Sequence, residues 1–163
     1  HQGAPCTSEM KRRPGDAVWE IGDTEIYGYT ADERNRVEQW KQQNFERIIE
    51  CPLIEKNLTK QDCFGMLERV GIELPAMYKL GFRNNNCIGC VKATSPTYWN
   101  LVRETRPDVF AARAEQSRRL GVTLVRVKNK RIFLDELSPD ARGRPLKQLK
   151  MPECGIHCEE QHA

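Results

Sequence analysis

Two cysteines separated by two residues, Cys87 and Cys90, form the strongest chemical signal in the chain. The intervening Gly89 lets the loop bend so that both sulfur atoms can face one ion. Zinc sites and iron–sulfur clusters use this spacing repeatedly. The spacing therefore favours a metal or cluster site, while a redox dithiol and a pair without a special role remain open.

A second cysteine pair lies in the last ten residues, where Cys154 and Cys158 flank His157. A neighbouring cation lowers the pKa of a thiol and raises its thiolate fraction. Cys154 is therefore a candidate nucleophile, with His157 beside it. Alternatively, Cys154 and Cys158 complete a four-cysteine zinc site with the first pair.

Two further segments carry residues suited to anions. Cys6 lies shortly before a basic run that begins at Lys11, and this combination could hold a cluster or an anion, or be a solvated surface. Gly28 ends a predicted strand, where a glycine lets a ligand approach the backbone closely. Arg36 follows one turn into the next predicted helix, where free amides and a guanidinium can bind phosphate or sulfate. The alternative is an ordinary capped helix with charge pairs along its surface.

The elements that must position these residues indicate an α/β fold. Residues 24–29, 31–43 and 47–53 read as strand, helix and strand, which predicts a βαβ unit. Thr59 is a predicted N-cap for a helix that would bury its apolar side chains, namely Cys63, Met66, Leu67 and Val70.

Prolines, glycines and apolar patterns predict the elements of the rest of the chain. Prolines and glycines predict an irregular segment over the first fifteen residues, and residues 17–21 could form a short strand. The remaining predicted elements are a short helix at 75–80, a loop at 83–92, helices at 96–106 and 107–120, and a hairpin at 124–137. We expect the hairpin and the tail after it to be an appendage without chemistry.

Composition limits the functions to be considered. The 163 residues carry 26 basic and 23 acidic side chains, and a net charge of +3 is too balanced to indicate nucleic-acid binding. No apolar run approaches a membrane span and no signal peptide is evident. Because no secretion signal is evident, we expect a reducing, cytoplasmic location. Seven cysteines cannot all pair internally, and we expect Cys51 and Cys63 to be buried apolar residues.

Taken together, these segments resemble the carboxyl-terminal portion of the phosphoadenosine phosphosulfate reductase family, which is adenine-nucleotide alpha-hydrolase-like. The resemblance covers residues 3–106 and the last ten. It rests on Cys-Thr at position 6, Tyr-Gly at 27 followed by Arg36, Pro-Leu at 52, Thr-Lys-Gln-Asp at 59, Leu-Pro-Ala-Met-Tyr-Lys-Leu-Gly-Phe at 74, the Cys-x-x-Cys pair and Glu-Cys-Gly-Ile-His at 153.

The resemblance implies a reaction and a set of roles. Cys154 would attack the sulfate sulfur of an adenine nucleotide (PAPS or APS), and a thioredoxin-like thiol donor would release sulfite from the resulting S-sulfocysteine. Cys6, Cys87 and Cys90 would ligate a 4Fe-4S iron-sulfur cluster, with zinc as the alternative. Lys11, Gly28 and Arg36 would face the nucleotide. The implied architecture is a partial open parallel sheet flanked by helices.

The chain also departs from the family pattern. Thr7 stands where cluster-bearing members have a second cysteine, and no Ser-Gly-Gly-x-Asp-Ser-like phosphate loop is present. We therefore expect a fragment whose nucleotide-loop region is missing, with a reductase-like domain at 1–120 and a hairpin and mobile tail at 121–163. Two alternatives remain: an ATP-dependent sulfur transferase, acting in tRNA thiolation or DNA phosphorothioation, and a non-catalytic zinc-binding module.

Overall fold

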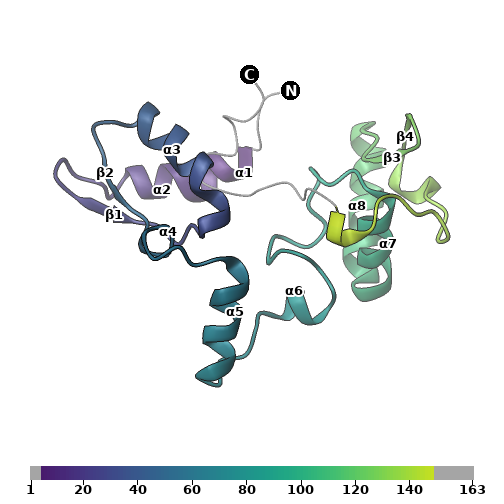
Figure 1. The fold of residues 1–163 in the computed structure, drawn as a ribbon. Coiled ribbons are helices and arrows are strands. Elements are labelled where there is room, and N and C mark those ends of the chain that lie inside the picture. Colours follow the sequence, from purple (N-terminus) through teal and green to yellow (C-terminus); the bar gives the residue numbers. More distant parts are fainter. Residues whose placement is uncertain (1–4, 149–163) are drawn as a thin grey trace. The chain divides into compact units, whose positions relative to one another are not determined.

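The computed structural model describes residues 5–148, which form two compact units that meet in the sequence between Leu74 and Pro75. Figure 1 shows the order of the elements along the chain, which mixes helices with two small sheets and is α/β. One sheet is a parallel pair and the other an antiparallel pair. The open sheet of the family stays a proposal. The expected division at residue 120 also stays a proposal.

The first unit begins with a helical segment where the sequence predicted irregular structure. α1 (Pro5–Thr7), a π-helical turn (Ser8–Arg12) and α2 (Arg13–Asp16) follow one another directly. Pro14 lies in the first turn of α2, where proline is tolerated although it lacks an amide hydrogen. Glu9 and Arg13 form an ion pair of 2.6 Å one turn apart, which supports the helix. The prediction of an irregular segment is therefore wrong for residues 5–15.

Residues 17–21 do not form the strand that their apolar character suggested. The amides of Val18 and Trp19 donate to the carbonyl of Gly15, which makes this segment a turn. Ile21 is 92% exposed. A local turn formed with Gly15 thus takes the place of strand pairing.

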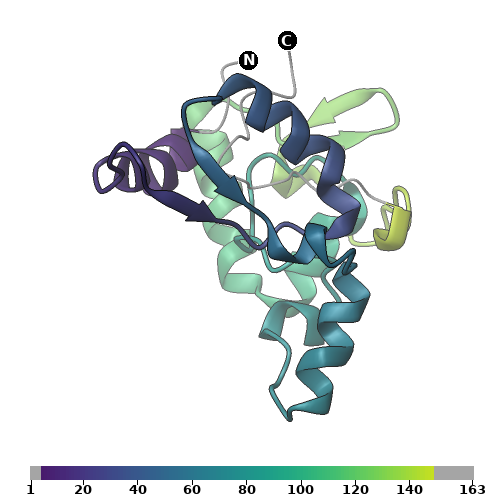
Figure 2. The ribbon, with the colours of Figure 1, turned by 60° about the vertical axis from the view of Figure 1, so that its left-hand side comes forward.

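The predicted βαβ unit is present. β1 (Thr24–Ile26) pairs in parallel with β2 (Ile48–Glu50), and between them run a 3₁₀ turn (Ala31–Glu33) and α3 (Arg34–Gln43). Figure 2 shows α3 crossing from one strand to the other. The apolar cluster around the βαβ unit comes from α3, from β2 and from the residues that follow β2: Val37, Trp40, Ile49, Cys51 and Ile54.

Two helices close the first unit. α4 (Pro52–Glu55) follows β2, and α5 (Lys60–Arg69) starts at Thr59, whose hydroxyl accepts a hydrogen bond from the Asp62 amide as predicted. The predicted burial of the α5 apolar face is wrong, because no described residue of α5 is buried and Met66 is 44% exposed. No helix or strand of the first unit that the structure describes packs extensively against α5, so this face stays uncovered by them.

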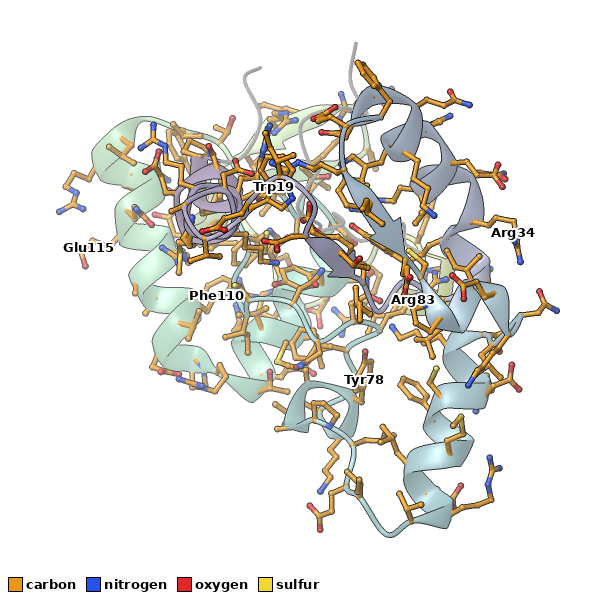
Figure 3. The ribbon with its side chains drawn as sticks, turned by 90° about the vertical axis from the view of Figure 1, so that its left-hand side faces the viewer. Trp19, Arg34, Tyr78, Arg83, Phe110 and Glu115 are labelled. Carbon is orange, nitrogen blue, oxygen red and sulfur yellow. The ribbon has the colours of Figure 1, made fainter. Side chains whose placement is uncertain are left out.

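The second unit is built around two helices that begin and end as the sequence predicts. α6 (Ala76–Lys79) precedes the cysteine loop, and α7 (Pro96–Thr105) and α8 (Pro107–Leu120) each start at a proline. Gly121 ends α8 in the left-handed conformation, with φ of +64°. Figure 3 shows Phe110 on α8, and the guanidinium carbon of Arg103 from α7 lies 4.2 Å from the centre of its ring.

The hairpin is part of the core of the second unit, and the expectation of an appendage is wrong. β3 (Val125–Val127) pairs with antiparallel β4 (Lys130–Ile132), followed by 3₁₀ turns at Leu134–Glu136 and Leu146–Gln148. Val125 and Leu134 are fully buried in one apolar cluster, whose other buried members are Phe82, Ala93, Tyr98, Trp99, Val102, Leu124 and Leu137. The apolar residues of the hairpin segment therefore form one hydrophobic core together with residues of α7. Among the described residues, no helix combines the length and apolar character that crossing a bilayer requires.

Candidate functional site

The Cys-x-x-Cys loop lies between α6 and α7, in a stretch without helix or strand as predicted. Cys87 is exposed and Cys90 is half-buried, and the two are not joined by a disulfide. One thiol therefore faces solvent while the other lies closer to the core. The loop, with both cysteines, belongs entirely to the second unit.

Gly89 fixes the bend between the two cysteines. Its φ is +69°, a conformation that favours glycine, and a Cβ atom at this position would lie 2.6 Å from Cγ1 of Val109 on α8. The carbonyl of Gly89 accepts a hydrogen bond of 3.2 Å from Nε of Arg113, also on α8. Only glycine fits here, so α8 sets the path of the loop.

α7 holds the loop at its second cysteine. The Cys90 amide donates to the hydroxyl of Tyr98 over 3.1 Å, and the Cys90 carbonyl accepts from the Ala93 amide over 3.0 Å. The Ala93 carbonyl in turn accepts a 2.7 Å bond from the indole of Trp99. Burial raises the pKa of Tyr98, so its hydroxyl stays protonated at neutral pH.

The donor set of this loop fits half of a metal site. Two soft sulfur donors, the ligand type of zinc and iron–sulfur sites, stand on a loop whose backbone is hydrogen-bonded to α7 and α8. In residues 5–148, no three side chains of Cys, His, Asp or Glu gather in a way that could hold a metal ion. Cys6, the third predicted ligand, is an exposed residue of α1 in the first unit. The ligand set of Cys6, Cys87 and Cys90 stays a prediction.

The predicted anion site at the end of β1 contains the arrangement of a capped helix. The Glu33 carboxylate accepts from the Thr30 amide over 3.3 Å and pairs with Arg36 over 3.2 Å. The Ala31 amide donates to the carbonyl of Leu58. Groups that could receive an anion are thus already engaged inside the protein, and the role of Arg36 in binding stays a prediction.

Two other predicted residues, Gly28 and Lys11, lie in exposed positions of the first unit. Gly28 precedes Tyr29, whose ring centre lies 5.2 Å from the guanidinium carbon of Arg36. No atom lies within 4 Å of a Cβ built on Gly28, so a ligand could approach the backbone there. Lys11 is exposed on the π turn. These positions are compatible with contact to a small anion.

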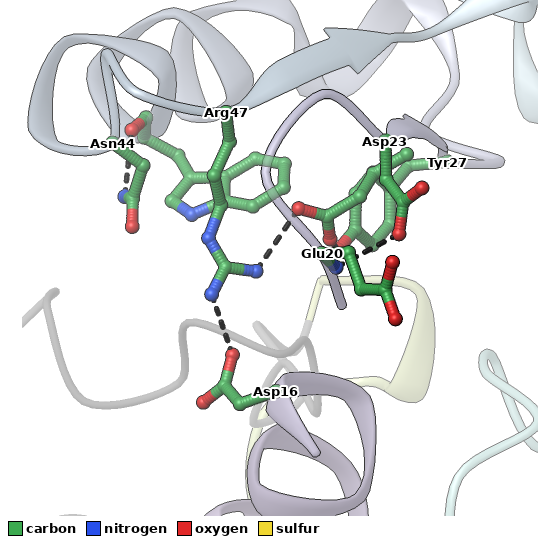
Figure 4. A network of polar contacts seen from close by, with 8 residues as sticks. Asp16, Glu20, Asp23, Tyr27, Asn44 and Arg47 are labelled. Atoms are coloured by element: carbon green, nitrogen blue, oxygen red, sulfur yellow. Dashed lines mark hydrogen bonds and ion pairs between the residues drawn. The ribbon is translucent and has the colours of Figure 1, made fainter. Parts of the chain in front are cut away.

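Sequence reasoning missed a network around Arg47. Figure 4 shows its guanidinium, which pairs with Asp16 over 2.6 Å and with Glu25 over 2.9 Å. The same group stacks on the ring of Trp19, 4.5 Å from its centre. Glu25 also accepts a hydrogen bond from the hydroxyl of Tyr27. The network ties the end of the N-terminal helical segment to β1, and its partners are too distant in sequence for a local pattern to reveal them.

The other described cysteines differ in burial. Cys51 is 3% exposed among apolar side chains, as predicted, and burial raises the pKa of its thiol. Cys63 is only half-buried on α5, so the prediction of a buried residue there is wrong. The predicted nucleophile Cys154 and its neighbour His157 lie outside the described residues.

The comparisons leave the family as a resemblance. No protein-family model, no curated protein and no solved structure compared with the chain matches it.

Proposed function

We propose that the chain is a sulfonucleotide reductase-like protein with an adenine-nucleotide alpha-hydrolase-like fold. The observation that carries the proposal is the Cys-x-x-Cys loop, whose backbone is held by Tyr98 from α7 and by Val109 and Arg113 from α8. The loop presents two sulfur donors, the ligand type that zinc and iron–sulfur sites use, on a backbone fixed by these contacts. The parallel βαβ unit, with Gly28 past the carboxyl end of β1, gives a second line of support.

The proposed reaction uses a thiol as nucleophile. The thiolate of Cys154 attacks the sulfur of the adenylyl sulfate, the bond from that sulfur to the phosphate oxygen breaks, and the nucleotide leaves as a phosphate. Cys154 then carries a sulfonate group. A thioredoxin-like dithiol attacks the Cys154 sulfur, releases sulfite and is oxidised to a disulfide as the cysteine returns to a thiol.

The residues of this chain have defined tasks in the proposal. Cys6, Cys87 and Cys90 would hold the iron–sulfur cluster, which when bound supplies a local charge beside the anionic substrate. Lys11 and Arg36 would bind the sulfate or phosphate oxygens, which requires Arg36 to exchange its Glu33 partner for the ligand. His157 would raise the thiolate fraction of Cys154.

A structural zinc module is a second candidate. It is favoured because Glu33 pairs with Arg36 and accepts from the Thr30 amide, an arrangement that caps a helix and does not need an anionic substrate. In that case the cysteine loop holds an ion without a redox role, and the anion site is an ordinary helix start. An ATP-dependent sulfur transferase shares the fold but forms different products, namely adenylate and pyrophosphate.

The test combines metal content with turnover of the native protein. Anaerobic preparation should yield iron and acid-labile sulfide with a broad absorption band, and Cys87→Ser should remove both. The native protein should release sulfite from adenylyl sulfate, and Cys154→Ser should abolish this release without changing the metal content. Stoichiometric zinc without colour would support the zinc module. Adenylate and pyrophosphate made from ATP would support the sulfur transferase.

A further inference from the structure

The balanced charge of the whole chain conceals a strong asymmetry between its two units. Residues 75–148 carry fifteen Lys and Arg against six Asp and Glu, a net charge of +9. Residues 5–74 carry ten basic against fourteen acidic side chains, a net charge of −4. The second unit is therefore a strongly basic body, and a polyanion would experience a local attraction that the net charge of +3 does not reveal.

The β3–β4 hairpin, residues 125–132, contains four basic side chains and no acidic side chain. Arg126, Lys128, Lys130 and Arg131 are all exposed, and none forms an ion pair with another residue that the structure describes. Elsewhere in this unit, Asp108 pairs with Arg106, and Asp135 and Glu136 both pair with Arg118. Half of the acidic side chains are thus committed to arginines outside the hairpin.

The hairpin keeps its cations in an unfavourable arrangement. Arg126 and Arg131 are directly opposite each other in the antiparallel register, and like charges at such a pair destabilise a sheet. Lys128 adopts φ of +53° at the turn, where glycine and asparagine are usual. A sequence selected for hairpin stability alone would avoid both features, and a bound polyanion would relieve the repulsion.

The outer strand and its surroundings indicate the kind of polyanion. The amide of Arg126 donates to the carbonyl of Thr94, so β3 is anchored on its inner side and β4 forms the outer strand. The exposed positions from the end of β3 through the turn to β4 are cationic or polar. A protein partner generally needs an apolar centre in its interface, which this row of side chains does not offer.

We propose that the β3–β4 hairpin binds the phosphate backbone of a nucleic-acid duplex, independently of base sequence. Closely spaced cations match a duplex, which presents one negative charge per ~1.7 Å of helix axis. Backbone contacts of this kind position a protein on a duplex without reading its bases. The proposal does not rest on the reductase chemistry, which takes place at other residues.

Counterion release sets the expected size of the effect. Four phosphate contacts predict a slope of about −3.6 for log K against log salt, which is a loss of about 150-fold in affinity between about 50 and 200 mM salt. Each cation removed should reduce the slope by about 1. Binding titrations at several salt concentrations therefore give the number of hairpin cations that contact phosphates.

The experiment measures binding of the full chain to a fluorescent duplex of about 20 base pairs by anisotropy. The test variant is Lys128→Gln with Lys130→Gln, and the matched control is Lys41→Gln with Lys56→Gln, which removes two exposed lysines from the first unit. Circular dichroism confirms that both variants are folded. The hairpin variant should weaken binding and lower the slope by about 2, while the control keeps the wild-type slope.

Three outcomes would overturn the proposal. Equal weakening by both variants would show that only bulk charge acts. A duplex that does not bind at low salt would leave the cations as protection of an outer strand against edge-to-edge pairing. Competition by polyglutamate as strong as that by the unlabelled duplex would assign the hairpin to an acidic protein instead.

Discussion

The substitution Gly89→Ala tests whether α8 shapes the cysteine loop. Placing alanine at φ of +69° costs about 1 to 2 kcal/mol in backbone strain. The new methyl group would also lie 2.6 Å from Cγ1 of Val109, and forced overpacking costs about 1 to 3 kcal/mol more. We therefore expect the second unit to lose about 2 to 5 kcal/mol of stability.

The matched control is Gly121→Ala, because Gly121 has φ of +64° with no atom within 4 Å of the built Cβ. It should cost only the strain, about 1 to 2 kcal/mol. Native-state hydrogen exchange of α7 and α8 peptides measures the second unit by itself. Val109→Ala in the Gly89→Ala background should recover the steric part, as a double-mutant cycle would show. Equal losses for the two glycine substitutions would refute the inference that α8 dictates the bend.

Three more predictions concern the second unit. Tyr98→Phe removes the hydroxyl that accepts a hydrogen bond from the Cys90 amide, and it should lower the free energy of unfolding in urea by about 1 to 3 kcal/mol. An unchanged urea midpoint would mean that water replaces the hydroxyl. The Arg106 hydrogen bond lowers the pKa of Asp108 to about 2, so the stability it contributes is complete above the unfolded pKa of about 3.9 and is lost as pH falls towards 2. Asp108→Asn should remove this acid-dependent part from a pH series of unfolding midpoints, and an identical acid limb would contradict the assignment. Arg126→Gln should raise hairpin stability by about 0.2 to 1 kcal/mol by relieving repulsion from Arg131, and a lower thermal midpoint would argue against that repulsion.

Local signals predicted most of the elements. Prolines at the starts of α7 and α8 and Gly121 at the end of α8 set boundaries through backbone geometry alone, so sequence is sufficient there. The βαβ unit followed from the change between strand and helix patterns. The prediction missed the N-terminal helical segment because proline occurs both in irregular segments and in the first turn of a helix, and Pro14 lies in the first turn of α2.

Burial and long-range support were harder to predict. The spacing of Met66 and Val70 indicates an amphipathic helix, but whether a face is covered depends on the elements that reach it. The cysteine spacing identified the loop, while its support by Val109 and Arg113 comes from residues twenty or more positions away. Arg47 likewise joins segments that only the folded chain brings together.

The most direct test of the proposed function follows sulfur from substrate to protein. Native protein is mixed with adenylyl sulfate labelled on its sulfur, without a thiol donor, and peptides are then analysed. We expect a sulfonate on Cys154, its release as sulfite when a thioredoxin-like dithiol is added, and no labelling in Cys154→Ser. Sulfite formation that persists in Cys154→Ser would contradict the proposed reaction.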